Sequence, residues 1–240
     1  MKLLELTLET PEENLALDEA LLEVAEAGEE PGEVLRLWES PGHVVVLGRS
    51  SNAQAEVNLD ACRRRGIPVL RRASGGATVL IGPGCLMYAV VLSYERRPQL
   101  RMIEMAHQFV LERLRRAIEP QVPEITSSGT SDLTMNLRKF SGNSLRCRQR
   151  HLLYHGTIVY DFCMAMMSEC LAAPARQPDY RNGRTHQDFV ANIPIDPDIL
   201  RGQLAHTWEA ASPLQDWPST ETARVVAERY SQAKWRIGGN

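Results

Sequence analysis

The sequence predicts an α+β fold in which helices flank a central mixed β-sheet. Apolar runs typical of buried strands occur at residues 43–48 and 86–92, and apolar residues recur at helical spacing over 11–27 and 102–117. These elements do not alternate strictly as strand and helix, as they would in a doubly wound parallel sheet. We therefore expect a sandwich of one sheet with helices packed against it.

The first helix has a clear start and a clear end in the sequence. Thr10 is the expected N-cap, Pro11 suits the first helical position, and Glu13 completes a capping box. Gly28 is expected to end the helix. A strand over residues 2–8 precedes it, because apolar and polar residues alternate there.

Shorter elements account for the rest of the chain. The other predicted strands cover residues 34–38, 68–71, 134–140 and 155–162. The last two of these strands are expected to pair as antiparallel neighbours. Further helices are predicted over residues 58–65, 163–171 and 220–234, and the chain between 174 and 197 is expected to be irregular. With no repeat or linker, residues 1–240 are expected to form a single domain.

Composition excludes several classes of protein. The chain has 27 basic and 30 acidic residues and a net charge of −3, which argues against general binding to nucleic acid. It lacks a signal-peptide pattern and any apolar run near the roughly 20 residues that span a bilayer. Five cysteines without a CxxC pair indicate reduced thiols. We expect a cytoplasmic protein that does not enter the membrane.

A loop with two adjacent glycines follows the strand at 68–71. Arg71 and Arg72 precede Gly75 and Gly76, so fixed positive charge lies beside backbone that a ligand can approach closely. This pattern is neither a Walker A loop nor a GxGxxG motif. A tight hairpin with solvated arginines remains the alternative interpretation.

A second candidate cluster surrounds Lys139. The stretch 138–144 places this lysine beside a sharp turn at Gly142, where its ammonium group suits a phosphoryl group or a developing oxyanion. Asp132 is placed to position the lysine or to hold Mg²⁺ near phosphate oxygens. His155 enters a later strand beside a glycine. The alternative for each residue is an ordinary surface or turn position.

In combination these segments resemble the catalytic domain shared by lipoate-protein ligases, octanoyltransferases and biotin-protein ligases. Residues 14–19 (Asn-Leu-Ala-Leu-Asp-Glu) and 44–52 resemble the opening of the lipoate ligases, and residues 71–76 resemble their lipoate-binding loop. The segments that resemble the acyl-adenylate site are 131–133, 138–144 and 155–157. The resemblance covers about residues 1–195, and it implies a sheet and helices like the core of class II aminoacyl-tRNA synthetases and biotin synthetases.

The resemblance also implies a reaction. Lipoate or octanoate would be activated with ATP and Mg²⁺ to an acyl-AMP, and a lysine of a lipoyl-domain protein would then take the acyl group. Lys139 would be the catalytic cation that bridges the acyl carbonyl and the α-phosphate. The other residues expected to contact substrate or nucleotide are Arg71, Arg72, Ser74, Gly75, Gly76, Ala77, Thr78, Val79, Leu80, Asp132, Ser141, Gly142, Asn143, His155, Gly156 and Thr157.

The implied acceptors are the E2 subunits of 2-oxoacid dehydrogenases and the H protein of glycine cleavage. The chain departs from the family at Ile81, where a histidine is common, and at Ser131, where the ligases usually have asparagine. It also ends near the close of the catalytic domain, without the small C-terminal accessory domain of many ligases. We therefore expect either a separate accessory polypeptide or an enzyme that performs transfer alone.

Two alternative functions remain open at this point. One is an octanoyl- or lipoyl-transferase that uses acyl carrier protein or a preformed acyl-AMP. A thioester route of this kind needs a cysteine near Lys139. The usual positions, within 124–131 and near Pro174, lack one, but Cys147 and Cys170 are candidates. The other alternative is a non-enzymatic binder of lipoate or acyl groups.

Overall fold

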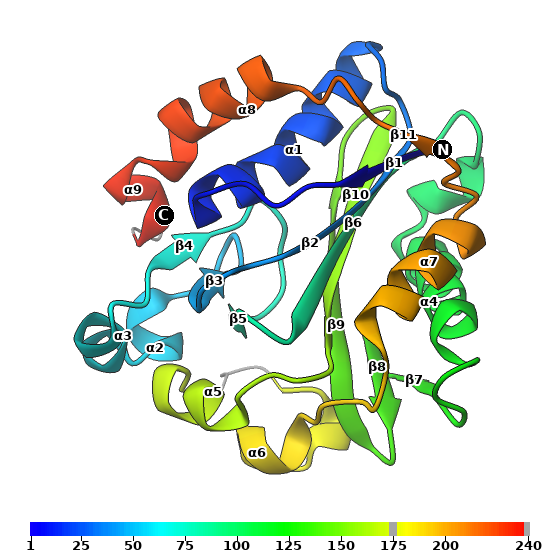
Figure 1. Cartoon of the computed structure of the whole chain (residues 1–240). Helices are drawn as coiled ribbons and strands as arrows, with labels where there is room; N and C mark the ends of the chain where they lie inside the picture. The colour runs from blue at the N-terminus through cyan, green and yellow to red at the C-terminus, as the bar shows by residue number, and fades with distance from the viewer. Residues whose placement is uncertain (173–176, 238–240) are drawn as a thin grey trace.

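The computed structural model describes residues 1–172 and 177–237, in which two β-sheets are flanked by helices (Figure 1). Within this part of the chain the larger sheet has eight strands. Their spatial order is β11 (Ser212–Pro213), β1 (Lys2–Glu5), β2 (Val34–Glu39), β6 (Cys85–Ser93), β10 (His151–Val159), β9 (Arg138–Cys147), β8 (Asp132–Met135) and β7 (Thr126–Ser128). Since β1 is parallel to β2 and β2 is antiparallel to β6, the sheet is mixed, and the predicted α+β class is confirmed.

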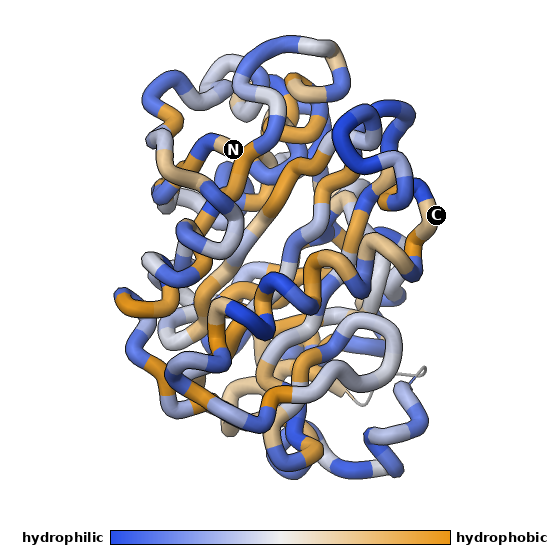
Figure 2. Tube along the Cα trace, turned by 90° about the vertical axis from the view of Figure 1, so that its right-hand side faces the viewer, coloured by the Kyte–Doolittle hydropathy of each residue, from blue (hydrophilic) through white to orange (hydrophobic). Residues whose placement is uncertain are grey.

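Helices cover both faces of this sheet. Helix α1 (Pro11–Ala27) lies on one face, with α8 (Ser219–Val225) packed beside it, and α4 (Ile103–Ile118) and α7 (Pro197–Thr207) lie on the other face (Figure 1). Hydrophobic segments run through the middle of the molecule, while most outer turns are hydrophilic (Figure 2). None of the described helices has the length and hydropathy needed to cross a membrane.

The smaller sheet has the order β4 (Val69–Arg71), β3 (Val44–Leu47) and β5 (Val79–Ile81). The helices α2 (Ala53–Glu56) and α3 (Leu59–Arg65) belong to the same part of the chain. The remaining elements are η1 (Pro98–Arg101), α5 (Met164–Cys170), η2 (Asp179–Arg181), α6 (His186–Phe189), the π-helical turn η3 (Val226–Tyr230) and α9 (Ala233–Arg236).

The first helix forms as the sequence predicts. The Thr10 side chain accepts a hydrogen bond from the Glu13 backbone, Glu13 returns the bond, and Gly28 ends the helix in the left-handed region at φ 84°. The side chains of β6 alternate between the two faces of the sheet. Ala89 and Val91 pack with the leucines of α1, while Val90 and Leu92 belong to the core on the side of α4. This packing fixes α1 on the sheet.

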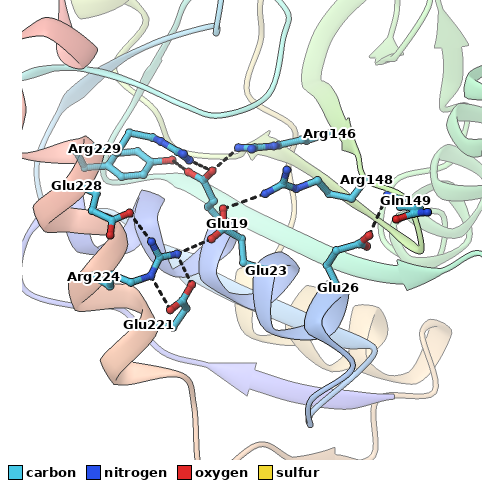
Figure 3. Close-up of polar contacts among 11 residues, drawn as sticks. Glu19, Glu23, Glu26, Arg146, Arg148, Gln149, Glu221, Arg224, Glu228 and Arg229 are labelled. Atoms are coloured by element: carbon cyan, nitrogen blue, oxygen red, sulfur yellow. Dashed lines mark hydrogen bonds and ion pairs between the residues drawn. The ribbon is translucent and has the colours of Figure 1, made fainter.

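Acidic residues of α1 form ion pairs and hydrogen bonds with two later segments of the chain (Figure 3). Buried Glu19 forms ion pairs with Arg146 of β9 and Arg229 of η3, and it accepts a hydrogen bond from the Tyr230 hydroxyl at 3.0 Å. Burial, followed by the charge of Glu19, raises the pKa of Tyr230 well above its usual value. The C-terminal segment is therefore held against α1 by charge as well as by apolar packing.

One predicted strand is wrong. Residues 134–140 are not a single strand, because the chain reverses at Asn136 and Leu137, which have φ of 51° and 60°. Met135 pairs directly with Arg138. Asn136 and Leu137 therefore form a two-residue hairpin loop between β8 and β9. The sequence signal was weak because the second loop position, where glycine is favoured, is a leucine. The predicted pairing of 134–140 with 155–162 is replaced by β9 pairing with β10.

The Leu137→Gly substitution is expected to stabilise the protein by roughly 0.5–1 kcal/mol. The left-handed backbone costs a non-glycine residue about 1–2 kcal/mol, while glycine loses more entropy on folding by about 0.5–1 kcal/mol. Leu137 is 69% exposed, so little packing is lost. Urea unfolding measures the change. Leu137→Ala keeps the Cβ and should show no such gain, and a fall in stability for the glycine variant contradicts the argument.

Candidate active site

A pocket lies between the larger sheet and the loop that joins β4 to β5. Most of the residues predicted from the sequence to bind substrate line this pocket. They are Arg72, Gly76, Ala77, Thr78, Val79, Leu80, Lys139, Ser141, Gly142, Asn143, His155, Gly156 and Thr157. The other four, Arg71, Ser74, Gly75 and Asp132, are not among the lining residues. Two segments far apart in the sequence thus meet at one cavity.

Lys139 is the second residue of β9, and it lines the pocket. Its Nζ is 2.7 Å from Asp132 Oδ1, and the other oxygen of Asp132 accepts a hydrogen bond from the Tyr180 hydroxyl at 2.6 Å. Burial and the adjacent carboxylate both raise the pKa of Tyr180, so it remains a donor at neutral pH. A Cβ at Gly142 would come within 2.7 Å of the ammonium nitrogen. The glycine therefore provides the space that the lysine occupies.

Arg72 is the second cation of the pocket and is only 8% exposed. Its Nη2 donates to the carbonyl oxygens of Gly75 at 2.5 Å and Ala77 at 3.0 Å, and its Nη1 donates to Val46. Burial lowers the pKa of Arg72 to about 10, which leaves the guanidinium charged at neutral pH. Arg72 therefore shapes the glycine-containing loop from within and gives it positive charge.

Arg71 has a different position from the one predicted. It is 2% exposed, and its Nη1 donates to the carbonyl oxygens of Gly48, Arg49 and Ser51. Its Nε donates to the Trp235 carbonyl at 3.0 Å, while the Trp235 indole donates to the Arg71 carbonyl at 2.9 Å. Adjacent residues on a strand point to opposite sides, so only one of two consecutive arginines can face the pocket. Arg71 instead joins the loop after β3 to α9.

Gly156 of strand β10 leaves room for the side chain of Asn143 on the neighbouring strand β9. A Cβ at position 156 would lie only 1.9 Å from Asn143 Oδ1. The Asn143 amide lies in that space, accepts a hydrogen bond from the Tyr88 hydroxyl at 2.5 Å and donates to the Ser131 carbonyl at 2.7 Å. Ser131, a departure from the ligase pattern, returns a hydrogen bond to the Asn143 carbonyl. Asn143 is therefore held in a fixed orientation beside the lysine strand.

The sequence interpretation missed the apolar lining of the pocket. Met87 lies opposite Thr157 in the β6–β10 pairing, and Val159 is two residues after Thr157 on β10. Both side chains therefore lie on the same face of the sheet as Thr157, which was predicted to contact substrate or nucleotide. That spacing could have identified them. The other apolar lining residues are Leu15, Val46, Phe140, Met167, Leu171, Pro178, Phe189 and Val190. Because most of these come from distant elements, local sequence carried no signal for them.

Two polar groups in or beside the pocket, Glu56 and His186, were missed as well. Glu56 accepts hydrogen bonds from the Thr78 backbone and hydroxyl, at 3.3 and 2.6 Å. Burial raises the pKa of Glu56, but hydrogen bonds led by those from Thr78 outweigh it, and the net pKa is below the usual value. The Thr78 amide is therefore already occupied. Burial, assisted by Arg181, lowers the pKa of His186 to about 4, which leaves this lining histidine neutral at pH 7.

None of the five cysteines lies at Lys139. Cys170 has no exposed surface and is hydrogen-bonded to Cys62, and burial raises the pKa of both thiols, that of Cys62 to about 12. Cys147 ends β9, so at about 3.3 Å per residue it is roughly 26 Å from Lys139. The expected family position near Pro174 lies outside the described residues.

The described residues of the pocket offer no set of ligands for a resident metal. No Asp or Glu side chain is among its lining residues, and the described part of the chain contains no group of three or more His, Cys, Asp or Glu able to hold a metal ion. Asp132, predicted as a possible Mg²⁺ ligand, has one oxygen paired with Lys139 and the other bonded to Tyr180. Its chemistry therefore fits positioning of the lysine.

Comparisons with known sequences agree on a family. The lipoyl protein ligase A/B catalytic domain model matches residues 10–196. A putative lipoate-protein ligase A of Aeropyrum pernix is 27% identical over 86% of this chain and 74% of its own length. Lipoate-protein ligase A subunit 1 of Thermoplasma acidophilum is 24% identical over 97% of this chain and 95% of its own. The match to a probable lipoate-protein ligase A of Mycoplasma pneumoniae spans only about half of that protein.

Solved structures have the same fold. A bipartite lipoate protein ligase from Thermoplasma acidophilum superposes with a TM-score of 0.82 at 21% identity, covering 100% of this chain and 98% of the other. A lipoate-protein ligase A bound with ATP gives a TM-score of 0.82 at 22% identity, with all of both chains covered. The family model covers most of the chain, and most of the residues predicted to bind substrate line one pocket. The protein belongs to the lipoyl protein ligase A/B catalytic domain family.

Proposed function

We propose that this chain is the catalytic domain of a lipoate-protein ligase, which activates lipoate or octanoate with ATP and passes the acyl group to a protein lysine. The observation that carries this proposal is that Lys139, held by Asp132, lines one pocket together with Arg72 and many apolar side chains. A substrate that has a hydrocarbon chain, a carboxylate and a phosphate fits that combination.

The apolar region fits a medium-length acyl chain. Met87, Val159 and Met167 line it from three different elements, and methionines adapt well to an irregular chain or ring. The carboxylate of such a chain would then lie toward Lys139, while the loop shaped by Arg72 would receive the phosphate groups. This orientation places the reacting atoms beside the two cations.

In the first step, a carboxylate oxygen of the acid attacks the α-phosphorus of ATP. The bond from that phosphorus to the bridging oxygen of pyrophosphate breaks, pyrophosphate leaves with the electron pair, and acyl-AMP remains. Lys139 would offset the negative charge shared by the carboxylate and the α-phosphate as they approach. Because Asp132 and Gly142 hold the ammonium group in place beforehand, little reorganisation is required.

In the second step, the neutral amine of an acceptor lysine attacks the acyl carbon. The carbon–oxygen bond to AMP breaks, AMP leaves with the electron pair, and the amine loses a proton to solvent as the amide forms. Lys139 would again stabilise the oxyanion that develops on the carbonyl oxygen. One cation thus serves both half-reactions.

Any Mg²⁺ in this reaction would arrive with ATP. Mg²⁺ commonly binds through substrate phosphates and water with few protein ligands. None of the described lining residues is acidic, which fits that mode. Lys139 and Arg72 would then be the groups that the protein itself supplies to the phosphates.

The acceptors would be lipoyl-domain proteins, namely the E2 subunits of 2-oxoacid dehydrogenases and the H protein of glycine cleavage. The relative from Thermoplasma acidophilum is named as one subunit of a ligase, and it matches this chain over nearly its full length. That similarity supports a single catalytic domain here that works with a separate accessory polypeptide. Five unpaired thiols support a location in the reducing cytoplasm.

Mass spectrometry of an acceptor lipoyl domain tests the proposal. The domain is incubated with the protein and either ATP plus lipoate or octanoyl-acyl carrier protein, with and without a candidate accessory subunit. A mass gain of one lipoyl group in the ATP mixture supports the ligase. A gain only from octanoyl-acyl carrier protein shows a transferase. No gain and no pyrophosphate release, together with measurable lipoate binding, identifies a binder.

The transferase is the second candidate because an octanoyltransferase LipM of Brevibacillus brevis is 24% identical over 95% of each chain. Burial of Cys170 and the distance of Cys147 from Lys139 argue against its thioester form. We expect a Cys147→Ser/Cys170→Ser double variant to keep the acyl transfer rate within about twofold of the parent protein. Loss of octanoyl transfer with an unchanged unfolding midpoint would establish a thioester route through one of these thiols.

A further inference from the structure

A chain of buried polar groups connects α1 to the glycine-containing loop. Asp18 Oδ2 is 3.3 Å from His155 Nδ1, and His155 Nε2 is 2.6 Å from Ser74 Oγ. Ser74 Oγ in turn accepts a hydrogen bond from Arg72 Nε at 3.0 Å. All four side chains are at least nine-tenths buried. At its far end, Asp18 forms an ion pair with Arg36 at 2.6 Å.

The two ends of this chain fix the directions of its outer hydrogen bonds, and the His155 tautomer decides the central one. A carboxylate only accepts, so His155 must donate from Nδ1 to Asp18. Arg72 only donates, so Ser74 must accept from it and can direct its own hydroxyl proton to His155 Nε2. A neutral imidazole protonated at Nδ1 satisfies both requirements. Any other state of His155 leaves the Ser74 hydroxyl proton without this acceptor inside the protein.

The chain ends on the residue that sets the shape of the loop. Arg72 turns the carbonyl oxygens of Gly75 and Ala77 toward itself, and the Ser144 hydroxyl adds a second donor to Gly75 at 2.8 Å. In a trans peptide the N–H points away from the C=O of the same unit. The Gly76 N–H therefore points away from Arg72, and it has no protein acceptor among the described residues.

We infer that Asp18, His155 and Ser74 form a positioning relay, which fixes the Arg72 guanidinium and thereby keeps the Gly76 amide directed at the anionic part of the substrate. In this arrangement both ring nitrogens of His155 are occupied by protein groups. His155 therefore lines the pocket as a positioning residue and does not exchange a proton with substrate. The inference rests on the proposed function only for the identity of that anion.

The first test is the protonation state of His155 in the full-length protein. Long-range proton–nitrogen correlation spectra distinguish the two neutral tautomers of histidine from imidazolium, and a His155→Gln spectrum assigns the signal. We expect the neutral form protonated at Nδ1 at pH 7.5. The Nε2-protonated tautomer or an imidazolium would overturn the relay. This result does not depend on turnover, so it holds even if the acceptor domain is never modified.

The second test measures the binding of a non-reactive lipoyl-adenylate analogue by calorimetry. Ser74→Ala removes both hydrogen bonds at the centre of the relay, and we expect the dissociation constant to rise at least about tenfold, as for loss of a bond to a charged group. Ser74→Cys keeps a weak donor and acceptor of similar size, so it should recover part of the affinity. Failure of the parent protein to bind the analogue would count against the proposed function instead.

Ser40→Ala is the matched control. Ser40 is also buried and donates one hydrogen bond to a backbone carbonyl, that of Gly42 at 2.7 Å, but it has no contact with the relay. This variant should lose some stability and keep the affinity of the parent protein. Equal affinities of the Ser74→Ala and Ser40→Ala variants would show that Ser74 is a structural residue only, and the relay would be rejected.

Discussion

Lys139→Ala is expected to reduce acyl transfer to a lipoyl domain by roughly 10²–10³-fold or more, the usual loss when a donor to a developing oxyanion is removed. The effect should appear in pyrophosphate release as well as in transfer, because one ammonium group serves both steps of the proposed mechanism. Lys139 is 26% exposed and lies at the pocket, so the unfolding midpoint should change little. Single-turnover kinetics of each half-reaction and a thermal melt measure these outcomes.

Lys234→Ala provides the control, since the sequence has only two other lysines and this one lies on the exposed C-terminal helix α9. It should retain the parent rate. Lys139→Arg keeps the charge, but its planar group does not fit the space beside Gly142 and is expected to recover little activity. Rates within tenfold of the parent for Lys139→Ala would remove this residue from the mechanism.

Arg36→Leu is expected to have the largest effect on folding, a loss of about 3–5 kcal/mol in the free energy of unfolding. Arg36 has no exposed surface, and it pairs with Asp18 while donating to the Asn14 side chain and to the carbonyl oxygens of Asn14 and Leu6. Burial lowers the pKa of Arg36, and the charge of Asp18 opposes this shift. Removing the guanidinium leaves a buried carboxylate without its main partner. Urea unfolding followed by circular dichroism gives the value.

The pair of Arg63 and Asp60 offers a comparison of the same chemistry at the surface. Both side chains are more than 70% exposed, so Arg63→Leu should change the stability by less than about 0.5 kcal/mol. A double variant, Asp18→Asn with Arg36→Leu, should be more stable than Arg36→Leu alone, because the unpaired charge is gone. A small loss for Arg36→Leu would mean that the ion pair contributes little to the fold.

Much of the fold could be predicted because local signals agreed with the tertiary structure. The capping box at Thr10 and the left-handed Gly28 define α1 as predicted, and the continuous apolar run at 86–92 became the central strand β6. The prediction failed at the β8–β9 hairpin. There, Leu137 has the left-handed backbone conformation that glycine usually adopts in such a turn. Because the residue is a leucine, no sequence signal marked the turn.

The candidate site could be predicted in part, because some of its residues form local sequence patterns. Glycines and cations at 71–76 and 139–142 are local patterns, and they do line or support one pocket. Asp18 and Glu19 were noticed only as part of a motif, because a charged residue on an amphipathic helix looks the same whether it faces solvent or a buried arginine. Their partners, Arg36, Arg146 and Arg229, come from distant segments.

The sequence by itself determined the α+β class, most of its helices and strands, and the family, and it supplied the candidate residues for acyl-phosphate chemistry. Only the tertiary structure decided that Arg72 faces the pocket while Arg71 is buried behind it, and that the thiols lie away from Lys139. The physical reason is that residue type and spacing define local conformation and chemical capacity. Burial and pairing across the sheets define which of these groups meet, and those contacts join residues more than a hundred positions apart.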